Sequence, residues 1–291
     1  MRRTIMRVPR RLDRWRLQGF AARSALAAVA VVGAPGDASV RSPQYPNQPA
    51  GFVKLVEGAW DALPPYPATA ASGWWAGESM GNAAIVTDST VPAAWRRVLV
   101  CHVPRDTHDG VGSCKVNHDD FTEGGGAYYP KLYVSAWVKH SRNWVPHPIG
   151  SKMFWFEHPT ETCDGYSDVY STFGGVAMRV GVVQQNCSAT ERYMYANVGD
   201  GAYHSAFNFL GWWQRYEFLL AMNTGSEANG TFRMWVDGHL VCEYLNVQWL
   251  RNDGAKHLWS GIRYHNVYGG RGGLSASQYE YLGHLYVSGG N

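Results

Sequence analysis

The sequence of 291 residues predicts an all-β protein built from two antiparallel sheets. From Phe52 to the C-terminus, short apolar runs alternate with turn signals, and no helical stretch exceeds about two turns. Several of these runs alternate apolar and polar residues, as strands with one buried face do. About 240 residues of such strands, without an internal repeat, fit one large double-sheet domain better than an immunoglobulin-sized sandwich.

Residues 131–139 are the first clear strand. Their even-numbered positions are apolar and share one face: Leu132, Val134, Ala136 and Val138. The odd-numbered positions are aromatic or polar and face the other way. We therefore expect the even-numbered face to point into the core.

Three later runs predict a meander of antiparallel strands over residues 215–222, 231–236 and 239–245. Between the last two, Asp237 and Gly238 form a two-residue turn of the kind that needs positive φ. The closing run, residues 279–288, is expected to pair inside a sheet and so to tie down the end of the domain.

Composition divides the chain into residues 1–38, 39–50 and 51–291. Residues 1–38 hold eight Arg and two acids, a net charge of +6, so the total of +3 leaves −3 for the rest. An apolar run (25–32) and a small-x-small site (36–38) follow the basic start, which is the layout of a secretory signal peptide. A basic N-terminal arm is the alternative. The apolar run is too short for the roughly 20 residues of a membrane span.

Residues 39–50 are a proline-rich lead-in, and residues 51–291 are expected to form a single domain. Because the body is mildly acidic once the leader is set aside, bulk attraction to a polyanion is not expected. We expect a secreted protein with no membrane span and no nucleic-acid partner.

Five cysteines follow the leader. In an exported protein we expect the disulfides Cys101–Cys114 and Cys163–Cys187, each closing a short loop and stabilising it by roughly 2–4 kcal/mol. Cys242 is left over and is expected to be buried. A zinc site around Cys101 and Cys114 is the competing interpretation, although the spacings match no standard zinc pattern.

A family pattern lies in residues 211–238. The runs Gly211-Trp-Trp-Gln-Arg-Tyr-Glu217, Asn223-Thr224 and Gly230-Thr-Phe-Arg-Met-Trp-Val-Asp-Gly238 resemble the W-x-R-x-E, N-T and W-V-D-G segments of concanavalin A-like lectin/glucanase and laminin-G jelly rolls. Residues 150–156 and 268–273 resemble further segments of this superfamily, and the nearest members are secreted polysaccharide-lyase-like proteins. The resemblance implies a jelly-roll sandwich with a groove that binds glycan chains.

A glycan chain is cleaved either by hydrolysis or by β-elimination. Hydrolysis needs two carboxylates about 5–9.5 Å apart, and no strand carries the E-x-D-x-E run that supplies them in the hydrolase branch. β-Elimination on a uronic acid needs a cation or amide beside the sugar carboxylate, and a Tyr, His or Lys that takes the C5 proton. The candidate catalytic residues are Lys152, Arg192, Tyr193, Arg263 and His265. A solvated or cross-strand-paired polar face is the structural alternative for them.

The sequence contains 13 Trp, and most are expected to pack in the core, since one aromatic side chain buries about 150–250 Å². Trp75 and Trp144 lie in expected loops beside polar residues and glycine, so they are the candidates for stacking on sugar rings. Trp155, Trp212 and Trp235 are expected to be part of the framework.

No cofactor is expected, apart from a structural calcium ion for which Asp164 and Asp168 are the candidate ligands. The resulting hypothesis is a secreted jelly-roll protein that binds an extracellular polysaccharide or cleaves it as a lyase. The lyase requires its cations to share one face with a Tyr in reach, whereas a binding module requires exposed aromatics and no base. A non-catalytic structural or adhesive surface protein is the alternative.

Overall fold

The computed structural model describes residues 44–291 except 65–73, 77–79, 109–110, 119, 122–126, 146, 148–150, 160–163, 175–176, 186–191, 196–209, 226, 250–257 and 271. For β2 (Trp75–Ala76), β8 (Asp164–Gly174), β9 (Ala177–Gln185) and β10 (Arg192–Tyr195), only the backbone is described. The helical elements among the described residues are two single 3₁₀ turns, η1 (Met80–Asn82) and η2 (Ala93–Trp95). No helix in this part of the chain is long and apolar enough to cross a membrane.

The remaining strands are long and distributed over the whole described chain. They are β1 (Val53–Gly58), β3 (Ala83–Thr87), β4 (Arg97–Val103), β5 (Val111–His118), β6 (Lys131–His140), β7 (Ser151–Pro159), β11 (Gln214–Ala221), β12 (Gly230–Val236), β13 (His239–Val247), β14 (Gly261–Tyr268) and β15 (Gln278–Gly290).

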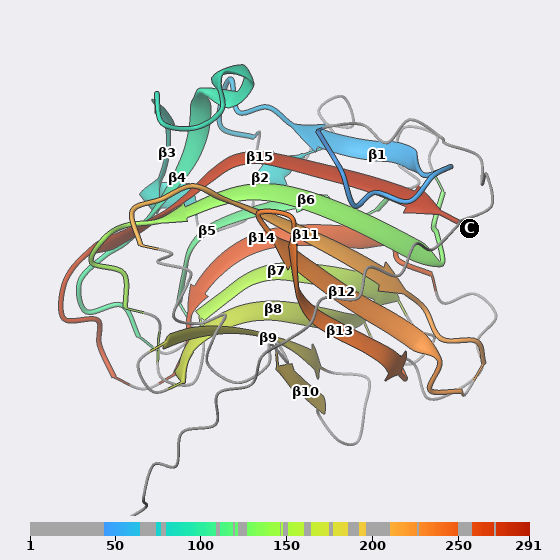
Figure 1. Ribbon diagram of the computed structural model, residues 1–291. Helices are drawn as coiled ribbons and strands as arrows, with labels where there is room; N and C mark the ends of the chain where they lie inside the picture. The colour runs from blue at the N-terminus through green and yellow to red at the C-terminus, as the bar shows by residue number, and fades with distance from the viewer. Residues whose placement is uncertain are drawn as a thin grey trace, which may run out of the picture. The chain divides into compact units, whose positions relative to one another are not determined.

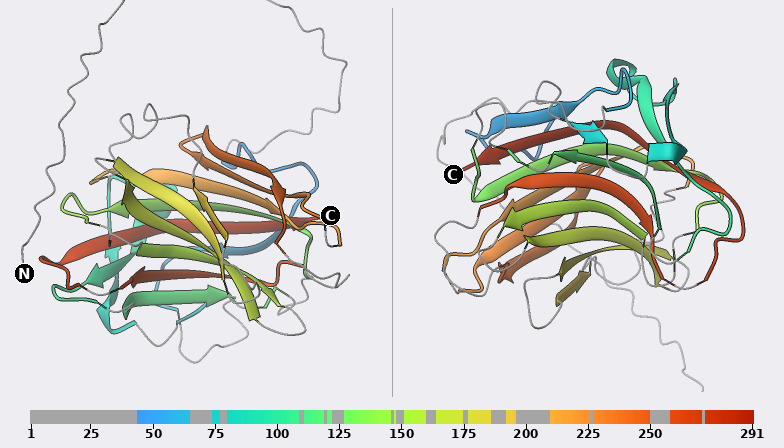
Figure 2. Two further views of the ribbon diagram at one scale, coloured as in Figure 1. Left: turned by 90° about the horizontal axis from the view of Figure 1, so that it is seen from below. Right: turned by 180° about the vertical axis from the view of Figure 1, so that it is seen from behind.

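These strands form two antiparallel sheets that lie face to face (Figure 1 and Figure 2). Sheet A has eight strands in the order β13-β12-β11-β6-β15-β4-β3, with β1 paired to the second half of β15. Sheet B has seven strands in the order β10-β9-β8-β7-β14-β5-β2. The predicted all-β architecture of two antiparallel sheets is confirmed.

The strands predicted from the sequence all belong to sheet A. β6 pairs with β11 and β15, and β11, β12 and β13 form the predicted meander. Asp237 and Gly238 turn the chain between β12 and β13 with φ of 50° and 83°, as the hairpin requires. β15 lies between β6 and β4, so the closing strand is central rather than an edge.

Apolar side chains from both sheets fill the space between them. In β6, the four even-numbered residues predicted to face inward are at most 1% exposed. In sheet B the same alternation directs Phe154 and Phe156 of β7 and Ile262 and Tyr264 of β14 into the core. The residues between them therefore lie on the opposite face of sheet B.

The outer face of sheet A is covered by the N-terminal lead-in. Tyr45 stacks on Tyr286 of β15 with ring centroids 3.8 Å apart, and the Asn47 side-chain amide donates to Glu217 over 3.1 Å. Tyr133 of β6 also donates its hydroxyl to Glu217. Tyr133 and Glu217 are fully buried although they point away from the main core.

The residues of the W-x-R-x-E segment bind the segments that cover the outer face of sheet A. The indole N–H of Trp213 donates to Asp88 over 3.2 Å, and Arg215 Nε lies 3.1 Å from the carboxylate of Glu217. Because Glu217 in turn accepts from Asn47, the three residues of the motif hold two surface segments against the sheet. The motif therefore has a structural role.

The expectation that Trp144 is exposed is wrong. Trp144 is 1% exposed, because Gln278 of β15 binds the backbone N–H and C=O of the adjacent Val145 and folds this loop inward. It packs with Val103, Tyr268 and Leu274. Trp212, expected to be part of the framework, is instead 62% exposed. The side chain of Trp75, the other stacking candidate, lies outside the described residues.

A disulfide joins the two sheets. Cys101 of β4 and Cys114 of β5 are bonded, with Cα atoms 5.5 Å apart, which confirms this predicted pair and uses both thiols that a zinc site would need. Cys242 is buried, as expected. The predicted pair Cys163–Cys187 lies outside the described residues.

Removing this cross-link is expected to destabilise the fold. The double variant Cys101→Ala/Cys114→Ala loses about 2–4 kcal/mol of unfolding free energy, because the unfolded chain regains the entropy of the open loop. Urea unfolding of the oxidised protein measures the loss. Cys242→Ala, which deletes a buried thiol but no cross-link, is the control, and an equal effect of the two variants contradicts the prediction.

Candidate active site

A group of polar side chains lies on the outer face of sheet B, opposite the core. We call it the His265 cluster. It comprises Lys115 and Asn117 of β5, Lys152, Trp155 and Glu157 of β7, and Arg263 and His265 of β14. The residues that alternate with them, such as Val116, Phe156 and Tyr264, belong to the core. The period of two along each strand thus produces this polar face.

The strand register brings the cluster together across three strands. Arg263 is paired with Asn117 on one side and with Trp155 on the other, and His265 is paired with Lys115. Direct cross-strand neighbours have Cβ atoms about 4.5–5.5 Å apart, so their side chains interact. Three of the predicted catalytic residues, Lys152, Arg263 and His265, are therefore part of one surface.

The backbone is irregular where His265 lies. Between the pairs Tyr264–Phe154 and Val267–Lys152, β14 has two residues where β7 has only Met153. The pairing of β14 with β5 also shifts between Asn266 and Val267. Bulges of this kind bend a strand and re-aim its side chains, and they are common beside active sites.

His265 is a neutral imidazole among cations. Its pKa is lowered from 6.5 to about 3, first by burial and then by the charges of Lys115, Arg263 and Lys152. Its ring lies 5.3 Å from that of Trp155, and neither ring nitrogen has a hydrogen-bond partner among the described residues. The imidazole is therefore unprotonated at neutral pH, and a carboxylate bound beside these cations would raise its pKa and make it a stronger base.

Two residues of β7, Glu157 and Trp155, each contact one of the cations. Glu157 forms an ion pair with Arg263, whose side chain remains 28% exposed. The ammonium group of Lys152 lies 4.7 Å above the ring centroid of Trp155, a cation–π contact. Both contacts hold a cation in place beside His265 and leave part of it accessible to a ligand.

Asn117 belongs to the cluster but was not among the residues predicted from the sequence. It is fully buried, and neither its amide nitrogen nor its carbonyl oxygen has a hydrogen-bond partner in the described part of the chain. Its amide N–H groups and its carbonyl oxygen can therefore pair with a polar group of a ligand on this face. The signal in the sequence was the alternation of Lys115 and Asn117 with Cys114 and Val116.

The strand register assigns Arg192 and Tyr193, the two predicted catalytic residues on β10, to different rows of sheet B. The backbone of Tyr193 lies in the row that runs through Val183, Asp168, Trp155 and Arg263. Arg192 lies in the adjacent row, which contains the core residues Phe156 and Ile262. Tyr193 therefore shares a row with Trp155 and Arg263, three strands away from Trp155, and Arg192 does not. The side chains of both lie outside the described part.

The structure does not test the prediction of a calcium site. Asp164 and Asp168 are on β8, where only the backbone is described. Among the described side chains, no group of His, Cys, Asp and Glu is arranged to hold a metal ion.

The arrangement suits proton abstraction beside an anion. The cations and the Asn117 amide would bind a carboxylate, and neutral His265 would take a proton from the carbon next to it. Glu157 is the one carboxylate within the cluster, and it is paired with Arg263. Acid–base hydrolysis by two carboxylates therefore has no basis in these residues.

No protein-family model matches the sequence, and no curated protein matches it. Solved structures do. The chain is similar to the marine PL-14 alginate lyase from Aplysia kurodai, with a TM-score of 0.54 and 13% identity over 81% of this chain and 98% of that chain. It is also similar to the endo-β-1,4-glucuronan lyase from the fungus Trichoderma reesei, with a TM-score of 0.53 and 15% identity over 76% of this chain and 92% of that one.

A third similar structure is an alginate lyase from Chlorella virus, with a TM-score of 0.52 and 15% identity over 75% of this chain and 93% of the other. At these identities the likeness establishes the fold alone. The protein is an all-β jelly-roll sandwich, as the sequence predicts, and the three similar structures named above are polysaccharide lyases.

The low pKa of His265 predicts how stability changes with pH. In the unfolded chain His265 has its ordinary pKa of 6.5, whereas in the fold the pKa is about 3. Between these values the unfolded chain binds one more proton, so this contribution is complete above about pH 6.5 and is lost as the pH falls toward about 3. His265→Gln is expected to make the loss shallower by about 1.4 kcal/mol per pH unit.

Urea unfolding at several pH values between neutral and mildly acidic measures this slope. Trp212→Gln, which changes an exposed residue that carries no titratable group, is the control and is expected to leave the slope unchanged. Equal slopes for wild type and His265→Gln would show that His265 is not buried in its neutral form.

Proposed function

We propose that this protein is a secreted polysaccharide lyase that cleaves a uronate-containing extracellular glycan by β-elimination. The observation that carries the proposal is the His265 cluster, in which a neutral imidazole lies among three cations on one face. The likeness of the fold to alginate and glucuronan lyases supports it. A polysaccharide is accordingly the proposed partner.

The groups of the cluster match the needs of elimination. Arg263, Lys115 and the unpaired amide of Asn117 bind the uronate carboxylate and stabilise the negative charge that develops on it. His265 takes the C5 proton, a C4–C5 double bond forms, and the bond from C4 to the glycosidic oxygen breaks. The leaving oxygen needs a proton in return, and Tyr193, whose backbone shares a row with Trp155, is the proposed donor.

The composition of the cluster supports a lyase over a simple binding module. A binding module needs exposed aromatic rings for stacking; Trp144, a stacking candidate, is 1% exposed, and the exposed Trp212 lies outside the cluster. Trp155 of the cluster is half-buried and is covered by Lys152. The cluster thus has few free ring faces, but it has an unpaired base and several cations.

Secretion and the domain limits belong to the same proposal. The buried disulfide Cys101–Cys114 fits an oxidising compartment. Residues 1–38 are proposed as the export signal, residues 39–50 as the lead-in and residues 51–291 as the lyase domain. A structural calcium ion at Asp164 and Asp168 remains part of the proposal.

The activity is tested on a panel of polyuronates, with a carboxyl-reduced sample of each glycan as the matched control. Ultraviolet absorbance of the unsaturated product is expected with a uronate polymer and not with its reduced form. His265→Ala and Arg263→Ala are each expected to lower kcat/KM by about 100-fold, because each removes a group needed in the transition state.

Trp212→Ala changes an exposed residue outside the cluster and is expected to leave kcat/KM unchanged. Two results contradict the proposal: no unsaturated product from any uronate polymer, or full activity of the folded His265→Ala variant.

A further inference from the structure

Tyr264 joins the His265 cluster to the interior of the sandwich. It lies between Arg263 and His265 in β14, but its side chain points the opposite way and is fully buried. Its hydroxyl donates a hydrogen bond to Glu280 of β15, which belongs to the other sheet. The strand that carries two residues of the cluster is thus anchored from behind to sheet A.

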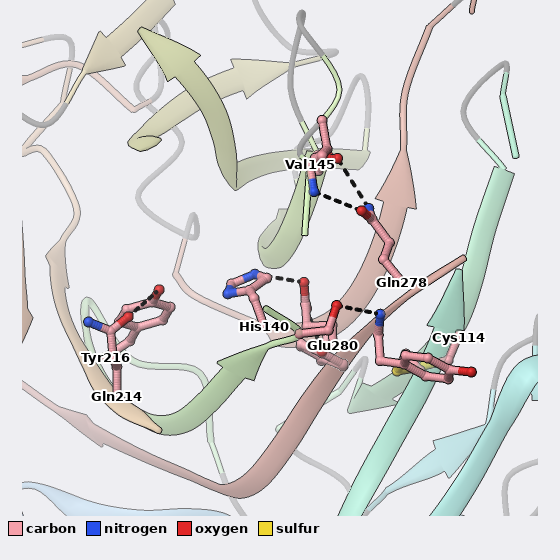
Figure 3. A network of polar contacts seen from close by, with 12 residues as sticks. Cys114, His140, Val145, Gln214, Tyr216, Gln278 and Glu280 are labelled. Carbon is pink, nitrogen blue, oxygen red and sulfur yellow. Dashed lines mark hydrogen bonds and ion pairs between the residues drawn. A yellow bond between two sulfur atoms is a disulfide. The ribbon is translucent and has the colours of Figure 1, made fainter. Parts of the chain in front are cut away.

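Glu280 is itself held within sheet A. It is fully buried, and its second carboxylate oxygen lies 3.0 Å from Nε2 of His140 on β6, which is 1% exposed (Figure 3). Glu280 is paired in register with His140 on one side and with Cys101 on the other. Tyr264, Glu280 and His140 therefore form a polar connection between the sheets, surrounded by apolar core.

This connection lies beside the bulges of β14. The bulges of β14 begin immediately after Tyr264 and include His265 and Asn266. A bulge interrupts the regular ladder hydrogen bonds that would otherwise fix the strand. The amide of Asn266 adds no support, because it is buried and has no hydrogen-bond partner in the described residues. The hydrogen bond of Tyr264 therefore holds β14 from the core side, next to His265.

The disulfide Cys101–Cys114 restrains β5, the strand beside the bulge of β14. Cys114 is opposite Asn266 in the register of β5 and β14, and its partner Cys101 is opposite Glu280. The covalent bond fixes β5 against sheet A, but it does not fix β14. The Tyr264–Glu280 hydrogen bond joins β14 directly to sheet A.

We propose that Tyr264 is a positioning residue of the active site, which sets the location of His265 and Arg263 through its hydrogen bond to Glu280. The inference rests on the proposed function for its catalytic consequence, but not for its structural one. If the anchor is lost, β14 relaxes at the bulge and the imidazole moves away from its place between Trp155 and the cations. A misplacement of about 1 Å can cost as much as 100-fold in rate.

The environment of His265 offers a readout independent of activity. The charged groups that face it are Lys115 from β5, Lys152 from β7 and Arg263 from β14 itself, and together with burial they hold its pKa low. Relaxation of β14 admits water and increases the distance to these cations, so the pKa of His265 rises toward its ordinary value.

The fold supplies a matched control for this test. Tyr133 and Glu217 form another fully buried tyrosine–glutamate hydrogen bond, on the outer face of sheet A away from β14. Tyr264→Phe and Tyr133→Phe thus delete the same chemical group from equally buried sites. Should a phenylalanine variant fail to fold, Glu280→Gln and Glu217→Gln form a second pair with the same logic.

Two measurements are made on the full chain: the pKa of His265 by NMR titration, and kcat and KM on the uronate polymer that the wild type cleaves. Tyr264→Phe is expected to raise the pKa by about one unit or more and to lower kcat by about tenfold or more with little change in KM. Tyr133→Phe is expected to change neither, although it also lowers the unfolding temperature.

An unchanged pKa of His265 in folded Tyr264→Phe overturns the inference, as does an equal rise in Tyr133→Phe. If the wild type cleaves no glycan but the pKa rises in Tyr264→Phe alone, the proposed function fails and the positioning role stands. The two ideas are therefore separable.

Discussion

The two-residue period of a β-strand is the constraint on which this protein depends, and β14 shows it most clearly. Ile262 and Tyr264 must enter the core, so Arg263 and His265 must leave it on the opposite face. The same alternation in β5 and β7 adds Lys115, Asn117, Lys152 and Glu157. A core and a reactive surface are thus produced by one set of strands, and a change on one face is transmitted directly to the other.

The charge balance of the site follows from this geometry. Three cations lie together on a body whose net charge is −3 once residues 1–38 are set aside. Glu157 offsets part of their repulsion through Arg263, and His265 adds none because it is uncharged. A bound carboxylate would therefore satisfy cations that the fold has already brought together, and attraction of an acidic glycan would be local rather than a property of the whole surface.

Sequence patterns predicted the positions of several strands well, but they did not predict which residues far apart in the sequence lie next to one another. β6, the meander and β15 followed from alternation and one turn, which are local properties. Asn117 was missed because its significance depends on β14, about 150 residues away in the chain, and no local signal shows that pairing. Trp144 was misjudged for the same reason, since its burial depends on Gln278, which binds Val145 across 133 residues. Arg192 and Tyr193 were grouped by proximity, whereas the register assigns them to adjacent rows.

The central place of β15 also determines the order in which the sandwich is able to assemble. β1 and the stacked ring of Tyr45 need the second half of β15, and β4 and β6 need it as their common partner. All of these segments are synthesised before β15. Until it is made, β1 lacks its partner and the pair β3–β4 stays unconnected to the group of β6, β11, β12 and β13. Such long-range pairing makes folding slow. Sheet A is therefore completed only after translation has passed β15, and a chain interrupted before that point lacks the strand around which the sheet is built.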